Sequence, residues 1–253
     1  MPILKTARNH FNEDLTRASN MLDHARPLQS GLLRDDILRA TWMFSVGACD
    51  AYFSDAYADL IARTLRAKEK QSSISIPDRL NNLRVPVVAV IRKSTGGWRW
   101  RMAARELIED ENVLSLEKIR SLFNQFCNNN NKLVNNNTIG DWIVHKDAKV
   151  RMFGISGSDY KKLAGKRKES EKKKALIKFE SRFKETFQRR HDCIHNCDRP
   201  KVRPQTITDK AVKKRIADIR FLVDRCEDAL VDQFPKYLND LGFSNTTISQ
   251  VTK

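Results

Sequence analysis

The chain has 253 residues, 40% of them hydrophobic, so it is long enough to bury a substantial core. Its 47 lysines and arginines outnumber its 31 acidic residues, which gives a formal net charge of +16. This excess favours polyanions through direct attraction and counterion release, and it makes nucleic acid the leading class of partner.

The N-terminus and the cysteines bear on the cellular location. Residues Met1 to Phe11 contain charged side chains and no apolar run of signal-peptide length, and no window approaches 18 uninterrupted apolar residues. Five cysteines are few and odd in number, which argues against a secreted disulfide framework. We therefore expect a cytoplasmic protein with reduced thiols and no membrane partner.

The spacing of apolar residues predicts an all-α fold. Glycine and proline are scarce, and the stretches between them have helical rather than strand periodicity. The broad apolar band of residues 34–70 predicts a central helix that is buried on more than one side. The helices expected in chain order cover 12–24, 34–70, 115–127, 158–196 and a last segment capped by Thr208 and ended by Pro235.

Residues 72–157 lack a clear pattern and are interpreted as an irregular, partly helical insertion within a single domain that covers 1–253. Within the insertion, Val85 to Ile91 fit either a strand or a buried helical turn. The asparagine clusters 128–131 and 135–137 favour a polar loop, because short amide side chains compete for backbone hydrogen bonds.

Two further segments have a composition that indicates a role. Trp98-Arg99-Trp100-Arg101 could stack on bases and bind phosphates, although aromatic residues in a helix more often pack against neighbours. The polar composition of residues 242–253 predicts a flexible tail.

The helix expected over 158–196 begins with a basic run. Eight lysines and arginines and only two glutamates lie between Lys161 and Lys174. Such a run is either a solvated helix face or a path that guides RNA phosphates to a site further along the helix. The side chains expected to contact RNA are Lys166, Arg167, Lys168, Lys172, Lys173, Lys174 and Arg189.

Further along the same helix, Leu176, Phe179, Phe183 and Phe187 form an apolar stripe, and a charged residue falls in line with it. Phe183 and Phe187 continue in register to Arg190 and Ile194, while His195 falls at the margin of the stripe. An unpaired buried guanidinium is costly, so Arg190 needs an acidic partner, an opening to solvent or a phosphate. The alternative is that Arg190 interacts with the last carbonyls of the helix, as basic residues there often do.

The segment Arg190-His191-Asp192-Cys193-Ile194-His195 has the form R-x4-H with a polar residue after the arginine. It lies late on a long helix and precedes a proline-containing turn and a last core helix. Upstream, Asp35 to Ala40 and Ser45 to Tyr52 include a serine- and alanine-rich run before Asp-Ala-Tyr. In these features the chain resembles the HEPN family, in particular its RiboL-PSP-HEPN branch, over about residues 30–70 and 175–235.

The resemblance implies a HEPN-like helical bundle that cleaves RNA without a metal or cofactor, at a composite site formed by a homodimer. His195 would transfer protons while the 2′-OH attacks the adjacent phosphorus, and Arg190 would hold a non-bridging oxygen. His191 or Asp192 would orient these groups. The products implied are a 2′,3′-cyclic phosphate and a 5′-hydroxyl. Family members often act as toxins or antiviral effectors, so an antitoxin or sensor protein is a further implied partner.

Two alternatives compete with this interpretation. His191, Cys193, His195 and Cys197 include the usual zinc ligands, but a helix separates the histidine pair from the cysteine pair by about 200°, so the four cannot surround one ion unless it unwinds. The second alternative is a HEPN-like bundle that no longer cleaves and instead binds nucleic acid or a protein. A nucleophile elbow and a phosphate-binding P-loop are both missing from the sequence.

Overall fold

The computed structural model describes residues 2–83, 98–108, 112–199 and 203–253. In these ranges every regular element is a helix and no strand occurs, so the predicted all-α fold class is confirmed there. The elements are α1 (Lys5–Ala25), α2 (Leu32–Lys70), α3 (Asp78–Asn81), α5 (Trp98–Glu106), α6 (Leu116–Phe123), the 3-10 helix η1 (Asn124–Phe126), α7 (Asn136–Ile143), α8 (Val150–Phe153), α9 (Gly157–Lys161), α10 (Gly165–Asn196), α11 (Asp209–Asp240) and α12 (Asn245–Thr252). The expected strand or helical turn at Val85 to Ile91 lies outside the described residues.

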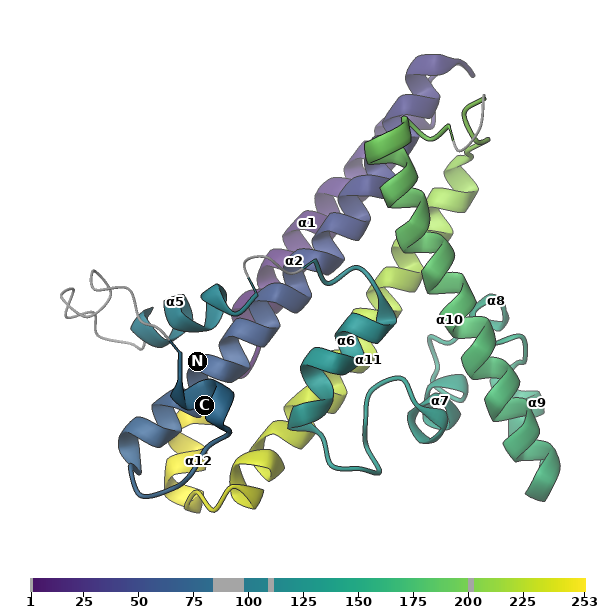
Figure 1. The fold of residues 1–253 in the computed structure, drawn as a ribbon. Helices are drawn as coiled ribbons and strands as arrows, with labels where there is room; N and C mark the ends of the chain where they lie inside the picture. Colours follow the sequence, from purple (N-terminus) through teal and green to yellow (C-terminus); the bar gives the residue numbers. More distant parts are fainter. Residues whose placement is uncertain (1, 84–97, 109–111, 200–202) are drawn as a thin grey trace.

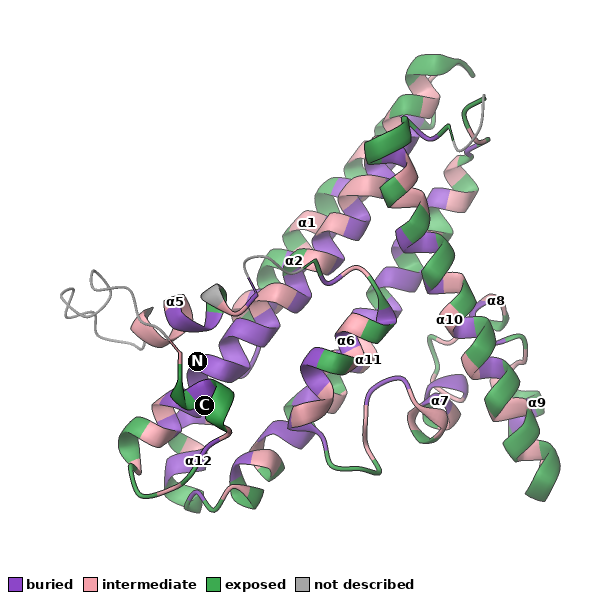
Figure 2. Cartoon of the chain, viewed as in Figure 1, coloured by how far each residue is buried: buried purple, intermediate pink, exposed green. Residues whose placement is uncertain are grey.

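Helix α2 is the central element of the fold. Its 39 residues span about 58 Å, and it packs against α1, α5, α10, α11 and α12. Figure 1 shows α1 antiparallel to α2, with α10 ending beside the first half of α2 and α6 to α9 around α10 and α11. Buried positions cover most of the second half of α2, whereas the first turns of α10 are largely exposed (Figure 2). The expected central helix is therefore confirmed.

Several boundaries differ from the expected ones. The first helix begins at Lys5 rather than at residue 12, and the basic helix expected from residue 158 is divided into α9 and α10 by residues 162–164. The last core helix continues through Pro235 to Asp240. Phe234 and Leu238 on either side of the proline are fully buried, so their packing keeps the helix intact where the backbone lacks one hydrogen bond.

The asparagine cluster 135–137 is not a loop throughout. Asn135 caps α7 by accepting hydrogen bonds from the backbone N–H groups of Asn137 and Thr138, and Asn136 and Asn137 form the first turn. The same property that disfavours asparagine inside a helix makes it a good N-cap. The earlier cluster, 128–131, is non-helical, as expected.

The expected flexible tail is instead the ordered helix α12. The Ser244 side chain caps it, and Ile248 and Val251 are buried against the rest of the core. Arg63 of α2 donates hydrogen bonds to the carbonyls of both Val251 and Pro2, so one side chain links the two ends of the chain to α2. The prediction is wrong here because two apolar residues suffice to bury a short helix inside a polar segment.

One hydrophobic core runs through the described part of the chain. The block expected to be an insertion contributes Phe123, Phe126 and Trp142 to the core that contains α2 and α11. None of the described helices combines the length and the apolar composition that a membrane span requires.

Candidate functional site

The R-x4-H segment forms the last two turns of α10. The helix ends one residue after His195, where Cys197 and Asp198 both adopt positive φ angles, 48° and 59°. The N–H groups of these two residues donate to the carbonyl of Asp192, which closes the helix. The segment therefore lies at a helix end that is sharply terminated without glycine.

His191 and His195 form an exposed pair on one face of α10. Their ring centroids lie 4.3 Å apart and their planes are inclined by 42°. Neither ring makes a hydrogen bond or an ion pair with a described residue. The pair therefore presents unoccupied imidazole nitrogens at the surface.

Arg190 is half-buried beside this pair. It makes no hydrogen bond or ion pair with the described residues, but it exerts an electrostatic effect on Asp50 of α2. Burial raises the pKa of the Asp50 carboxyl, while a hydrogen bond from the Val113 N–H and the positive charge of Arg190 partly offset that rise. The guanidinium is thus held near an acid of the central helix while its donors stay available.

A groove of about 790 Å³ between the start of α6 and α10 ends at Arg190 and His191. Leu114, Leu116 and Phe187 form an apolar part of its wall, and Arg120, which pairs with Glu180, and Lys184 add further basic groups. His195 does not line this groove, and Asp192 points its carboxylate at the side chains of Gln188 and Gln205, which both donate to it. Of the four residues expected to be catalytic, only Arg190 and His191 meet in this groove.

Arg189 has a structural role in this molecule. Its Nη2 donates to Asp198 Oδ2 at 2.9 Å and to the Thr206 carbonyl at 3.1 Å, and only 15% of its side chain is exposed. The fully buried Asp198 also accepts a hydrogen bond from Arg39 Nε at 2.8 Å. Asp198 thus joins Arg189 of α10 and Arg39 of α2, which fastens the turn after α10 to both helices, while the expected contact of Arg189 with RNA stays a prediction.

Sequence reasoning did not identify Asp198 or Arg39. Asp198 looks like one acidic residue in a polar turn, and its position between two arginines depends on the left-handed backbone that turns it inward. Arg39 leaves a weak signal, because it is a charged residue on the buried face of α2.

Trp42 lies behind the site, with two guanidinium groups close to its ring. Arg189 and Arg215 lie 5.1 Å and 5.3 Å from the centre of its ring, and its Nε1 donates to the Thr186 carbonyl. Cation–π contacts of this kind contribute about 0.5–2 kcal/mol each. Trp42 therefore joins α2, α10 and α11 directly behind the R-x4-H segment.

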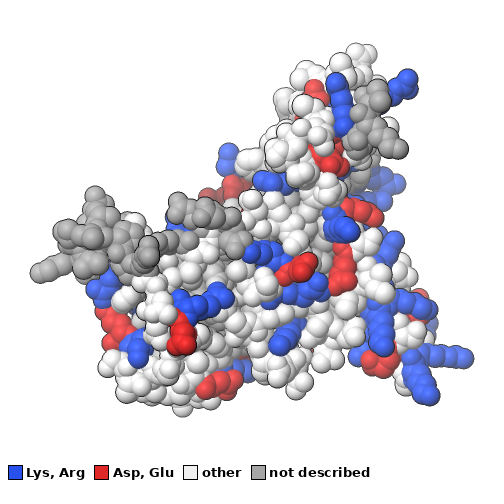
Figure 3. Space-filling model, viewed as in Figure 1, with Lys and Arg blue, Asp and Glu red and all other residues white. Residues whose placement is uncertain are grey.

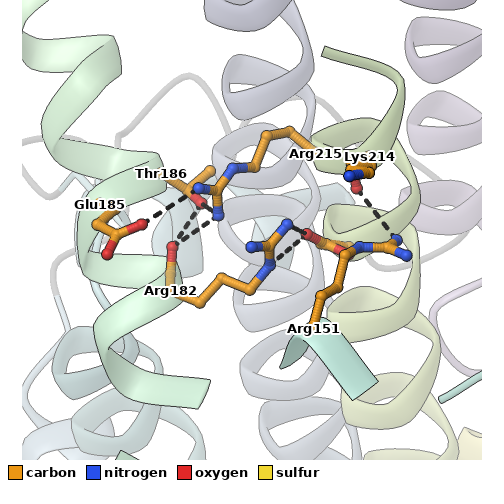
Figure 4. A network of polar contacts seen from close by, with 7 residues as sticks. Arg151, Arg182, Glu185, Thr186, Lys214 and Arg215 are labelled. Atoms are coloured by element: carbon orange, nitrogen blue, oxygen red, sulfur yellow. Dashed lines mark hydrogen bonds and ion pairs between the residues drawn. The ribbon is translucent and has the colours of Figure 1, made fainter. Parts of the chain in front are cut away.

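A second ionic network continues from this point (Figure 4). The buried Asp218 of α11 binds Arg151 of α8 and Arg182 of α10, with Nε–O distances of 3.0 Å and 2.6 Å. Arg215 donates to the Thr186 hydroxyl and the Arg182 carbonyl. Burial, together with the charge of Arg182, lowers the pKa of Arg215. The network fixes the position of α10 relative to α11.

The basic run lies at the opposite end of α10 from the R-x4-H segment, as the blue side chains at the lower right of Figure 3 show. Lys166 and Arg190 are 24 residues apart, which is about 36 Å along the helix. Lys172 pairs with Glu169, Lys174 pairs with Glu171, and Lys168 lies over the Tyr160 ring. The members that are exposed and form no ion pair with described residues are Lys161, Lys166, Arg167 and Lys173.

The tryptophan and arginine tandem lies away from the site, on α5. Trp100 Nε1 donates to Glu69, and Arg99 stacks on the Trp100 ring and pairs with the same glutamate. These side chains are therefore used within the protein; the side chain of Trp98 lies outside the described part.

The four-ligand zinc set does not converge. Cys193 is buried against the core, whereas the two histidines lie on the outer face of α10. In the ranges that the structure describes, no three His, Cys, Asp or Glu side chains are grouped so that they could hold a metal ion.

No family model, curated protein or solved structure matches this chain. The chemistry available to the site therefore has to follow from its own residues.

Proposed function

We propose that this protein is a metal-independent endoribonuclease of the HEPN type. The observation that carries the proposal is the position of Arg190. It is a half-buried guanidinium without a hydrogen-bond partner among the described residues, and on the same helix it directly precedes the exposed His191 and lies five residues before the exposed His195. A guanidinium with free donors can bind a phosphate and an imidazole can transfer a proton, and RNA transesterification can use both groups.

In the proposed reaction, His195 accepts the proton of the RNA 2′-OH as that oxygen attacks the adjacent phosphorus. Arg190 binds a non-bridging oxygen and stabilises the charge that develops in the transition state. The leaving 5′-oxygen takes a proton from a second imidazole, so the products are a 2′,3′-cyclic phosphate and a 5′-hydroxyl. Asp192 contributes through its backbone: its carbonyl accepts the hydrogen bonds that end the helix just after His195, and this helps to hold His195 in position.

A homodimer supplies the second set of groups. His191 and His195 face outward and are open to another molecule. Exposed apolar side chains lie nearby in the fold: Leu32 and Leu33 start α2 and Ile194 lies near the end of α10, and these helix ends share one end of the bundle (Figure 1). They provide the apolar contact that would bring two R-x4-H segments together.

Part of the basic charge lies on the same face as the histidines. Lys166, Lys173 and Lys184 precede His191 by 25, 18 and 7 residues, which are close to whole numbers of helical turns. All three are exposed and form no ion pair with the described residues. We propose that this lysine row binds the phosphates of a single RNA strand that leads to Arg190. A toxin or antiviral effector, controlled by an antitoxin or a sensor, is the biological role consistent with such an activity.

The test is cleavage of RNA in EDTA by the wild type, Arg190→Ala and His195→Ala, with His24→Ala as an exposed-histidine control. Loss of an acid–base group lowers the rate by about 10²–10⁴-fold, and loss of a charge-stabilising donor by about 10²–10³-fold. An RNA with one 2′-deoxy sugar at the cleavage position must resist the enzyme. Circular dichroism shows whether each variant keeps its helices.

Full activity in both Arg190→Ala and His195→Ala refutes the assignment of these residues to catalysis. A wild type that binds RNA tightly and in a salt-sensitive manner, but does not cleave it, supports the alternative function of a catalytically inactive binding module. The exposed lysine row is the observation that favours this second function.

A further inference from the structure

The geometry of the histidine pair allows it to bind a metal ion. His191 and His195 are one helical turn apart on the outer face of α10, with ring centroids 4.3 Å apart. Two histidines at positions i and i+4 of a helix present their imidazoles to one point in space. Zinc–nitrogen bonds of about 2.0–2.1 Å in a tetrahedral site place the two nitrogens about 3.3 Å apart, which two exposed rings at this separation reach by small side-chain rotations.

The surroundings of the pair determine which ions fit. The Asp192 carboxylate accepts hydrogen bonds from Gln188 and Gln205, and Cys193 faces the core, so neither is placed as a third ligand. Two imidazoles without a carboxylate favour zinc, nickel or copper over magnesium or calcium, which prefer oxygen ligands. Water can occupy the remaining coordination positions, because both rings are exposed.

We propose that His191 and His195 form a two-ligand site for a divalent transition metal, and that metal binding there switches off the ribonuclease. The second part of this inference rests on the proposed function. A metal ion bonded to His195 occupies the nitrogen lone pair that would accept the proton of the 2′-OH. The positive charge of the metal ion near Arg190 also changes the electrostatic field in which Arg190 binds a phosphate. Metal binding is therefore inhibitory, and the bound ion takes no part in the cleavage reaction, which needs no metal.

Metal binding is tested without RNA. Untagged protein is titrated with Zn²⁺ by isothermal calorimetry, and His191→Gln and His195→Gln are each expected to lose the tight binding. Two controls, His24→Gln and Cys197→Ser, are expected to retain it, because His24 lies on α1 and the Cys197 thiol follows the helix end. Circular dichroism verifies that the variants keep their helices.

Three outcomes would each overturn the site: Zn²⁺ fails to bind the wild type, the histidine variants bind it as tightly as the wild type does, or Cys197→Ser loses the binding. These outcomes do not depend on catalysis, so they are distinct from a failure of the proposed function.

Inhibition is tested on RNA. Zn²⁺ is expected to stop cleavage by the wild type, EDTA to restore it, and Mg²⁺ at the same concentration to leave it unchanged. Full cleavage at a Zn²⁺ concentration that saturates the calorimetric site overturns the regulatory part of the inference.

Discussion

Arg190 of α10 and Asp50 of α2 lie within electrostatic reach of each other without forming an ion pair shorter than 4 Å. The two residues are 140 positions apart in sequence, and each belongs to one of the two segments on which the HEPN interpretation rests. Asp50 is fixed by the Val113 N–H at 2.8 Å, so it provides a stationary negative charge behind the guanidinium. We interpret Asp50 as a positioning residue for Arg190.

Asp50→Asn is expected to lower RNA cleavage by up to about 100-fold, because a small displacement of a catalytic group has an effect of that size. Asn can keep the acceptor for Val113 and removes only the charge. The matched control is Asp55→Asn on the same helix, since Asp55 binds His10 and Arg105 instead. Equal activity of Asp50→Asn and the wild type would contradict the positioning role.

The same variant has a predicted pH signature in stability. Burial raises the pKa of Asp50 above its value in the unfolded chain, so its contribution to stability is complete below the unfolded pKa and is lost as the pH rises through the folded one. Asp50→Asn does not undergo that loss. Urea unfolding should therefore show that the variant gains stability relative to the wild type from acid to neutral pH; a constant difference would argue against the burial of an ionisable group.

Asp198→Asn is expected to destabilise the fold by roughly 3–5 kcal/mol, because it leaves Arg39 and Arg189 without their shared, buried carboxylate. Arg189→Gln should also lower the free energy of unfolding but leave RNA affinity unchanged. Arg199→Gln, an exposed neighbour in sequence, serves as the control. Chemical denaturation and RNA titration separate the two effects; a large loss of affinity in Arg189→Gln would instead assign Arg189 to the RNA surface.

The lysine row predicts how binding depends on salt. Changing Lys166, Lys173 and Lys184 together to Gln should weaken single-stranded RNA binding and reduce the slope of log affinity against log salt by about 0.7 for each phosphate that is no longer neutralised. The matched triple variant Arg167→Gln, Lys174→Gln and Lys178→Gln removes the same charge from another face of α10. If both triple variants show the same drop in affinity, the charge acts without regard to position.

Cysteine reactivity reports the packing of the end of α10. Burial raises the pKa of Cys193 to about 11 and that of Cys127 to about 12, whereas Cys197 is exposed. Iodoacetamide near pH 8 should therefore label Cys197 first, as measured by peptide mass spectrometry. Equally fast labelling of Cys193 would show that α10 opens at its end.

The buried thiols also predict how stability depends on pH. Because the raised thiol pKa values apply only to the folded state, the free energy of unfolding should decline as the pH rises above the ordinary thiol range.

The long helices could be predicted because apolar periodicity records which face of each is buried. The breadth of the band in 34–70 indicated the central position of α2, and Thr208 was recognised as the cap of α11. Packing overrode local rules elsewhere. Pro235 remains inside α11 because its neighbours are buried, and α12 forms although its sequence is polar.

For the candidate site, the sequence indicated the residue types at the end of α10 but not their surroundings. The apolar stripe was expected to reach Ile194, yet that side chain is 48% exposed, and the buried face continues to Cys193 instead. Trp42 of α2 contacts Thr186 and Arg189 of α10 on the side that precedes Cys193. Asp50, Asp198 and the distance between the basic run and Arg190 all depend on tertiary structure, which spacing alone does not record.

Trp42 makes this junction observable. The indole is almost fully buried, donates to a carbonyl of α10 and is enclosed by one guanidinium from α10 and another from α11. When α10 separates from α2, water reaches the ring, and its emission moves to longer wavelength. In a variant whose other three tryptophans are changed to phenylalanine, Trp42 becomes an intrinsic fluorophore directly behind the candidate site, able to report in real time whether ligands, partners or a second copy shift the helix that bears Arg190 and His195.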